Sequence, residues 1–319
     1  MVNIAFFGTP TFAVPTLDRL VTTGANVSVV VTQPDRRRGR GHRVAFSPVK
    51  KLALASDIPV LQPNSAKDSN FIAQLTDYAP DLGVVVAYGQ LLPDSVLNAP
   101  RLGTINVHAS LLPKYRGAAP IHRAVIAGER ETGITVIRLV KRMDAGPMLA
   151  RAVRPIRPDE TSDEIERDLA DVGANLLLSV IGDVSTGRCS EVPQDHSLAT
   201  VAPRLSREDG SIDWNRPAED VHNLVRGLHP WPHAFTYLHG DRHVILRTFV
   251  DVQSSFPQHP PGTICVAHGD RLLVSCGSGT TIGIKELQTA GRRPLATRAF
   301  LSGRSITIFS TFRAEPESP

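Results

Sequence analysis

Asn106 and His108 stand two residues apart at the end of an apolar run that predicts a β-strand over 104–108. Side chains two apart on a strand point to the same face, and open α/β sheets place their active sites at the carboxyl ends of their strands. The pair alone fits a histidine hydrogen-bonded within a core equally well. The loop over 110–120, which is punctuated by Pro and Gly, could wrap a flat ligand and favours a functional role for both side chains.

Asp144, in the turn over 143–147, is the third residue that could take part in chemistry. Its position also fits an ordinary turn aspartate. If the strands around this turn adjoin the strand of His108, the Asp144 carboxylate could hold the imidazole ring. An amide, an imidazole and a carboxylate suit acyl or formyl transfer to an amine, because the first two stabilise a developing oxyanion while the acid–base pair moves the amine proton.

Other kinds of site have weaker support. Ser110 could be a hydrolase nucleophile, but no GxSxG elbow surrounds it. Residues 8–10 follow the first expected strand without a GxGxxG or GxxxxGK[ST] pattern, so a tight strand-to-helix turn is a better interpretation than a dinucleotide or phosphate loop. The three cysteines form no CxxC pair, which argues against a zinc site and against a disulfide framework.

The elements that must position these residues alternate in the first half of the chain. Short β-rich runs are followed by stretches of helical periodicity, which is typical of a mostly parallel sheet covered by helices. Thr161 and Glu164 have the spacing of a capping box at the start of a long helix. We expect strands at 2–7, 26–32, 60, 82–87, 104–108, 133–140 and 148–153, and helices at 12–21, 48–55, 71–78 and from 161 to about 185.

The second half follows a different pattern. Residues 186–205 lose periodicity and are expected to be a linker, and one helix follows at 218–228. Five short strands are expected at 234–238, 243–249, 262–266, 272–275 and 281–287, which favours a small antiparallel barrel of the oligonucleotide-binding (OB) type. The length of 319 residues fits two domains, which we predict at 1–188 and 206–319 with a linker at 189–205.

Charge is concentrated in one segment. The formal net charge of the chain is +4, but residues 33–51 alone carry seven basic side chains against one acidic one, so the rest of the chain is slightly acidic. This pattern indicates a polyanion that binds at one place. There is no apolar run long enough for a membrane span and no secretory leader, so no membrane partner is expected and the expected location is cytoplasmic.

Together, Asn106, His108, Asp144 and the stretch 110–120 resemble the folate-dependent formyltransferases, which share this trio and an SLLPxxRGxxP loop. Further matching stretches run in order along essentially the whole chain and resemble the members that formylate initiator methionyl-tRNA. They are residues 7–12, 31–36, 39–41, 47–50, 84–89, 212–214 and 230–232. The resemblance implies an α/β fold, namely a Rossmann-like formyltransferase domain with a mostly parallel sheet, followed by a C-terminal OB-like β-barrel that binds tRNA.

The resemblance also implies a reaction. A formyl group would move from N10 of 10-formyltetrahydrofolate to the α-amino group of methionine on initiator tRNA, without a metal. Asn106 would hydrogen-bond the formyl oxygen, His108 would stabilise the oxyanion and help move a proton, and Asp144 would orient His108 and relay a proton through water. The folate-binding residues would be Tyr88, Gly89, Gln90 and Leu91 around the pterin, with Ser110, Leu111, Leu112 and Pro113 completing the site.

The basic segment gains a role from the same resemblance. In the family an insertion after the second strand reaches the acceptor end of the tRNA, and Arg40 is the matching position in this chain. Without the resemblance, a solvated flexible loop would be an alternative interpretation. The expected tRNA-binding residues are Arg36, Arg37, Arg38, Arg40 and Arg43.

Three other functions use part of these features. A hydrolase that releases formate from formylfolate, or a formyltransferase for an amino sugar or a nucleotide precursor, could use the same trio. The basic segment and the barrel argue against both. An RNA-binding protein without catalysis would not need Asn106, His108 and Asp144. We expect a monomeric enzyme.

Overall fold

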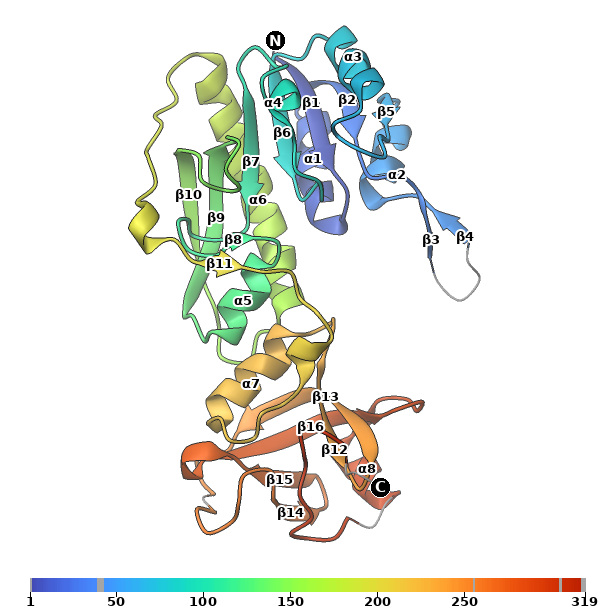
Figure 1. Cartoon of the computed structure of the whole chain (residues 1–319), viewed down its shortest axis with the longest axis vertical. Coiled ribbons are helices and arrows are strands. Elements are labelled where there is room, and N and C mark those ends of the chain that lie inside the picture. Colours follow the sequence, from blue (N-terminus) through green and yellow to red (C-terminus); the bar gives the residue numbers. More distant parts are fainter. Residues whose placement is uncertain (1, 39–42, 255, 304–305, 317–319) are drawn as a thin grey trace. The chain divides into compact units, whose positions relative to one another are not determined.

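The computed structural model describes residues 2–38, 43–254, 256–303 and 306–316 (Figure 1). The side chains of residues 37, 38, 43 and 44 are outside this description. The chain divides into two compact units. Unit 1 contains residues 1–120, 131–155 and 166–202, and unit 2 contains residues 121–130, 156–165 and 203–319.

Unit 1 is built on a seven-stranded sheet with the strand order β10-β9-β7-β6-β1-β2-β5 (Figure 1). The five strands from β7 to β5 are parallel, as predicted, because nearly continuous apolar runs suit strands that are buried on both faces. β9 is antiparallel to both β7 and β10. The strands are β1 (Asn3–Gly8), β2 (Asn26–Val31), β5 (Val60–Leu61), β6 (Leu82–Val86), β7 (Thr104–His108), β9 (Glu131–Arg138) and β10 (Met148–Pro155).

Helices cover the two faces of this sheet. Gly173 of α6 lies against Val107 and Ile134, so α6 packs on one face of β7 and β9. α3 packs on the other face through Phe71 and Leu75. The helices up to residue 185 are α1 (Val14–Thr22), with Pro15 in its first turn, α2 (Pro48–Ala55), α3 (Ser69–Asp77), α4 (Asp94–Leu97) and α6 (Ser162–Ser185), together with α5 (Pro120–Ile126), which belongs to unit 2 from residue 121.

Local signals explain several helix starts. The Ser47 side chain accepts a hydrogen bond from the Lys50 N–H at 3.0 Å and begins α2. At α6 the predicted Thr161–Glu164 pair is present, because the Thr161 N–H donates to the Glu164 carboxylate at 2.7 Å. The Thr161 hydroxyl also donates to this carboxylate instead of capping a backbone N–H, so the pair forms half of a capping box.

Two smaller pairings lie outside the main sheet. β3 (Arg36–Arg38) and β4 (Arg43–Ala45) form an antiparallel hairpin in the basic segment. β8 (Arg116–Gly117) pairs in parallel with β11 (Val201–Ala202). The segment expected to be a linker therefore adds a strand to unit 1 and also contains a short 3₁₀ helix at His196–Leu198.

Unit 2 contains an antiparallel sheet with the order β12-β13-β16-β15-β14, and β17 pairs with β16. Residues 309–313 form bridges with Thr263 beside β14 and with Tyr237 on β12, and so join the two edges of the sheet into a barrel. Trp214 lies in its core, stacked on Phe312. The elements are α7 (Ala218–Gly227), β12 (Ala234–Leu238), β13 (Asp241–Val250), β14 (Ile264–His268), β15 (Arg271–Ser275), β16 (Thr281–Thr289), β17 (Leu295–Ala296) and α8 (Thr297–Ser302).

Two further observations concern the chain as a whole. All three cysteines are free thiols. Among the described residues, no helix combines the length and apolar character needed to cross a membrane.

Candidate active site

Asn106 and His108 project from the carboxyl half of β7, and both are buried, at 9% and 5% exposure. The strand register pairs Asn106 with Val85 and Val85 with Phe7, so these side chains share one face of the sheet. Val107 points to the opposite face, against α6. The structure thus places the two polar side chains together, away from α6, as the spacing of two predicts.

The His108 ring has a hydrogen-bonding partner that the sequence did not indicate. Nε2 lies 3.0 Å from the carbonyl oxygen of Tyr115, and because a carbonyl only accepts, this nitrogen carries the proton. Nδ1 lies 3.8 Å from Oδ2 of Asp144, which is too long for a hydrogen bond. The ring is therefore held by a backbone carbonyl and faced by a carboxylate. A second proton on the ring would be directed at Asp144.

Asp144 is itself fixed by contacts other than His108. Its Oδ2 accepts a hydrogen bond from the Gly117 N–H at 2.9 Å. Its backbone lies in the left-handed region with φ of 48°, where a residue with a Cβ is strained. The turn also needs glycine at 146, because a Cβ there would meet the Arg138 carbonyl oxygen at 1.8 Å. The structure brings Asn106, His108 and Asp144 to one edge of unit 1.

The Asn106 amide has no hydrogen-bonding partner among the residues that the structure describes. Such an amide, mostly buried and beside an imidazole, can donate to a ligand oxygen without first breaking a contact within the protein.

The loop after β7 is held rigidly through Ser110. This residue is fully buried, and its hydroxyl donates to the Lys114 carbonyl at 2.7 Å. The Thr135 hydroxyl donates to the Ser110 carbonyl and accepts from the Leu112 N–H, at 2.7 and 3.1 Å. A hydroxyl that donates to a backbone carbonyl supports the loop, and within the portion of the chain that the structure covers it is not hydrogen-bonded to a base of the kind that activates a nucleophile. Leu112 is buried, whereas Leu111 and Pro113 are partly exposed.

Residues 87–91 lie at the neighbouring strand end, after β6. Tyr88 is 1% exposed, its ring meets Phe7 edge-on, and burial raises the pKa of its hydroxyl to about 12. Its side chain therefore points into the core, while Ala87, Gly89 and Leu91 are exposed. The Gln90 side chain accepts from the Ala66 N–H at 2.8 Å and fixes the segment. A ligand here would meet backbone and the Leu91 side chain.

Asp35, the one acidic residue of the basic segment 33–51, neutralises part of its positive charge. Lys50 Nζ lies 2.5 Å from the Asp35 carboxylate and 2.6 Å from Gln62, and the hydrogen bond from Lys50 lowers the pKa of Asp35. Arg36 is exposed at the start of the hairpin. Arg37, Arg38 and Arg43 belong to its strands, with side chains outside the description, and Arg40 lies outside the described residues.

Arg116 and Gln194 are site residues that the sequence analysis missed. Both are 6% exposed, and Arg116 donates from Nε and Nη2 to the Gln194 side-chain oxygen. They lie 78 positions apart. Arg116 is the arginine of the SLLPxxRGxxP loop, and its charge was a further signal, since a buried arginine requires partners.

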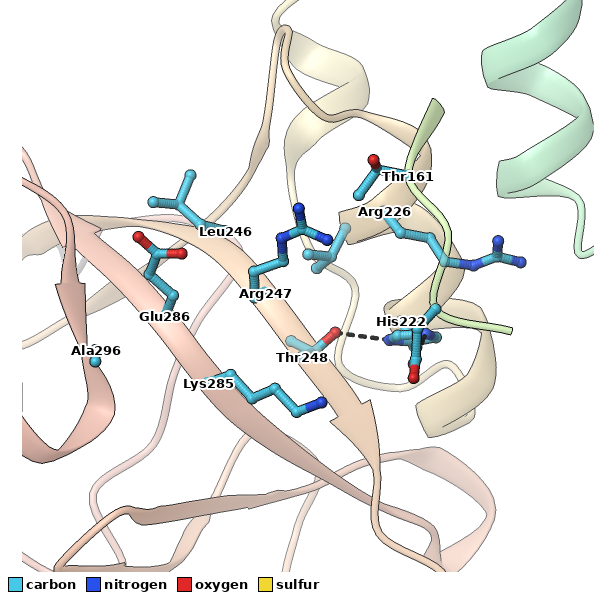
Figure 2. A pocket seen from close by; sticks show the side chains of 11 residues that line it. Thr161, His222, Arg226, Leu246, Arg247, Thr248, Lys285, Glu286 and Ala296 are labelled. Atoms are coloured by element: carbon cyan, nitrogen blue, oxygen red, sulfur yellow. Dashed lines mark hydrogen bonds and ion pairs between the residues drawn. The ribbon is translucent and has the colours of Figure 1, made fainter. Parts of the chain in front are cut away.

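Unit 2 has a pocket of about 390 Å³ between α7 and strands β13 and β16 (Figure 2). His222 lies there between the Thr248 hydroxyl and the Pro158 carbonyl, at 2.9 and 3.1 Å, and burial lowers its pKa. Arg247 and Lys285 extend from the two adjacent strands toward α7 (Figure 2). The lining also contains the cation of Arg226 and the carboxylates of Asp159 and Glu286, so the pocket carries a small excess of positive charge that favours an anion.

Metal ligation has no support in the described part of the chain. No group of three or more His, Cys, Asp or Glu side chains there is arranged to hold a metal ion.

Comparison with known proteins identifies both halves of the chain. Residues 2–181 match the formyl transferase family model, and residues 204–305 match the model of the formyl transferase C-terminal domain. The chain is 46% identical to the methionyl-tRNA formyltransferase of Pelobacter propionicus, over 95% of this chain and 94% of that protein. It is 44% identical to the protein of the same name from Geobacter sulfurreducens, over 98% and 95% of the two chains.

Solved structures share the fold at low identity. A sugar 3N-formyl transferase, WlaRD, crystallised with dTDP and 5-N-formyl-THF, has a TM-score of 0.67 at 15% identity, with 92% of this chain and 99% of that chain covered. HypX from Aquifex aeolicus in complex with tetrahydrofolic acid has a TM-score of 0.64 at 16% identity, with 98% and 51% covered.

Proposed function

The chain belongs to the methionyl-tRNA formyltransferase family, and from this premise we propose that Asn106, His108 and Asp144 form its catalytic centre. The enzyme transfers a formyl group from 10-formyltetrahydrofolate to the free amino group of methionine on initiator methionyl-tRNA. The observation that carries the proposed centre is the meeting of these three side chains at one sheet edge, with the Asn106 amide free to bind a ligand oxygen.

In the proposed mechanism, the methionyl amine attacks the formyl carbon. A carbon–nitrogen bond forms, the bond from the formyl carbon to N10 breaks, and a proton passes from the amine to N10. Asn106 donates to the formyl oxygen as its negative charge develops, and a protonated His108 adds electrostatic stabilisation. Asp144 faces Nδ1 of the ring without a hydrogen bond, so its negative charge orients the imidazole electrostatically, and Asp144 passes a proton on through water.

We propose that residues 88–91 bind the pterin of the folate. Residues 110–113 would complete the folate site beside it. Support comes from the exposed backbone at Ala87 and Gly89, directly after β6 and beside the carboxyl end of β7. Gly89 has φ of 93°, and the space beside its Cα is open. A flat heterocycle can approach such a backbone closely and pair with its N–H and C=O groups.

The tRNA acceptor end is assigned to the β3–β4 hairpin through Arg36, Arg37, Arg38, Arg40 and Arg43. The Lys50–Asp35 pair supports this, because it removes the one acid of the segment and leaves the arginines as its unbalanced charge. In unit 2 we assign further phosphate contacts to Arg247 and Lys285 at the pocket of Figure 2.

We propose that residues 1–188 carry out catalysis and that residues 206–319 position the tRNA, with residues 189–205 as the linker between them.

We further propose that the protein is a monomer that acts in the cytoplasm, where its tRNA substrate is used. Large exposed hydrophobic side chains lie in separate loops, for example Leu91, Trp231 and Val252, as is usual for monomers. Light scattering measures the molar mass of the purified protein in solution, which should be that of one chain of 34.5 kDa.

One assay tests the function. Purified protein is incubated with 10-formyltetrahydrofolate and methionyl initiator tRNA, and N-formylmethionine is measured after deacylation. Product that depends on all three components supports the proposal. Release of formate without N-formylmethionine would indicate a hydrolase and overturn it.

A further inference from the structure

We propose that Gln194 and Arg116 are positioning residues of the catalytic centre, through which the segment 194–202 fixes both groups that face the His108 ring. This inference rests on the proposed function, because it assigns a role within the same site. Those two groups are the Tyr115 carbonyl and the Asp144 carboxylate.

The first set of contacts is made by the Gln194 amide. Its Nε2 donates to the carbonyls of Asp144 and Gly146, at 2.9 and 2.7 Å, and so uses both of its protons on one turn. This turn holds Asp144 in the strained left-handed conformation, with φ of 48°. A residue with a Cβ stays in this region only when its surroundings enforce it. Gln194 supplies two of the contacts that do so.

Arg116 holds Gln194 from the other side. Its Nε and Nη2 lie 3.1 and 2.6 Å from the Gln194 oxygen, and Nη2 also donates to His196 Nδ1 at 2.8 Å. Burial lowers the pKa of the Arg116 guanidinium, and the charge of Asp144 opposes this effect. A buried cation restricts its neighbours strongly, because a lost partner leaves an unpaired charge. The Gln194 amide is thus oriented with its oxygen on Arg116 and its nitrogen on the Asp144 turn.

The second set of contacts is made by Thr200. The Tyr115 N–H donates to the Thr200 hydroxyl at 2.8 Å, and the Arg116 N–H donates to the Thr200 carbonyl at 2.9 Å. This segment therefore holds both the peptide whose carbonyl accepts from His108 and the peptide that precedes it. Tyr115 also has a left-handed backbone, with φ of 61°.

A catalytic consequence follows from these contacts. If the segment moved, the carboxylate and the carbonyl would both shift relative to the imidazole, although the fold of the sheet would remain. Misplacement by about 1 Å can cost about 10²-fold in rate. We expect loss of Gln194 to act on kcat and to leave the KM for folate and for tRNA nearly unchanged.

The substitution Gln194→Glu removes the hydrogen-bond donor of the side chain and keeps its acceptor. The carboxylate still accepts from Arg116, but an oxygen replaces the nitrogen that donates to the Asp144 and Gly146 carbonyls. Asn3→Asp is the matched control. The Asn3 Nδ2 likewise donates to two backbone carbonyls, of Tyr78 and Ala79, at 2.8 and 3.0 Å, and it lies at the opposite end of the strands in the same unit.

We expect Gln194→Glu to lower kcat about 10- to 100-fold, with both KM values within about threefold of the unchanged enzyme. Asn3→Asp should keep kcat within about twofold, even if both variants lose similar thermal stability. Equal losses of kcat in the two variants would show a general structural effect and overturn the proposal.

A second readout does not depend on activity. The ring ¹⁵N chemical shifts of His108, assigned by comparison with His108→Gln, report the protonation pattern of the imidazole. Gln194→Glu should change them and Asn3→Asp should not. Unchanged His108 shifts in Gln194→Glu would contradict the inference. An unmodified enzyme that forms no N-formylmethionine would contradict the proposed function instead, and the shifts would still test the role of Gln194.

Discussion

The Asp144 carboxylate lies 3.8 Å from Nδ1 of His108 and faces the ring without a hydrogen bond to it. Its position is set by the Gly117 N–H, at 2.9 Å from the same oxygen that faces the ring. The carboxylate is thus held without a hydrogen bond from the imidazole. It is an electrostatic partner for a charged ring in the proposed mechanism.

The first prediction concerns that charge. Asp144→Asn keeps an oxygen that can accept from the Gly117 N–H but removes the negative charge beside His108. We expect kcat to fall by about 10²-fold or more, because proton transfer through a positioned group contributes on this scale. Single-turnover formylation measures the chemical step, and equilibrium titration measures folate binding, which should be retained. A kcat near that of the unchanged enzyme would show that the charge is not needed.

The second prediction concerns the unpaired amide. Asn106→Ala removes the proposed donor to the formyl oxygen, and loss of one such donor costs about 2.7–4 kcal/mol in the barrier. His108→Ala should also cost several kcal/mol. Folate binding should be largely retained in both variants, because the proposed pterin contacts come from the 88–91 backbone. Normal single-turnover chemistry with lost folate binding would reverse these assignments.

The third prediction tests the hairpin. Arg36→Ala and Arg40→Ala should each raise the KM for tRNA and lower the slope of log K against log salt by about one, while the KM for folate stays constant. Arg188→Ala is the control, since Arg188 is an exposed arginine of unit 1 outside the hairpin. Unchanged tRNA kinetics in the hairpin variants would remove the hairpin from the tRNA site.

The fourth prediction tests the pocket of unit 2. The double variant Arg247→Ala, Lys285→Ala should weaken tRNA binding with a reduced salt slope and leave folate binding unchanged. Exposed Arg298→Ala, on α8 of the same unit, is the matched control. If both proteins bind tRNA as the unchanged enzyme does, the pocket is not a phosphate contact.

The fifth prediction uses three histidines of unit 2. Burial lowers the pKa of His122, His222 and His233, so the folded state favours their neutral forms. The unfolded chain binds more protons below pH of about 6.5, so stability falls as pH decreases from that value toward the folded-state pKa values. Both tryptophans, Trp214 and Trp231, belong to unit 2, so thermal unfolding followed by tryptophan fluorescence reports on it. We expect the midpoint to decrease between pH 7.5 and 5.5, and a constant or rising midpoint would contradict this linkage.

Much of the site could be predicted because its signals are local. The spacing of two placed Asn106 and His108 on one face, and the apolar run gave the bounds 104–108 that β7 has in the structure. The mostly parallel sheet followed from buried, continuous apolar strands. These features depend on residues that are neighbours in the sequence.

The remaining features depend on contacts between distant residues. Gln194 lies in a stretch without periodicity, and nothing near it indicates that its amide binds a turn 50 positions earlier. The backbone carbonyl of Tyr115 carries no sequence signal at all. Pairing of β11 with β8, and the bridges of residues 309–313, involve too few residues to produce a strand pattern.

The bridges at Thr311 and Arg313 have a practical consequence for shortened forms of the protein. The same short segment pairs with the backbone of both edge strands of the C-terminal sheet, at Tyr237 of β12 and at Ile264 of β14. A chain cut before residue 309 would leave N–H and C=O groups unpaired on both edges, and an open sheet edge is a template for pairing with other chains. Residues 309–313 therefore shield both edges from pairing with other chains, and a chain that ends before them should form aggregates even though every proposed catalytic residue is retained.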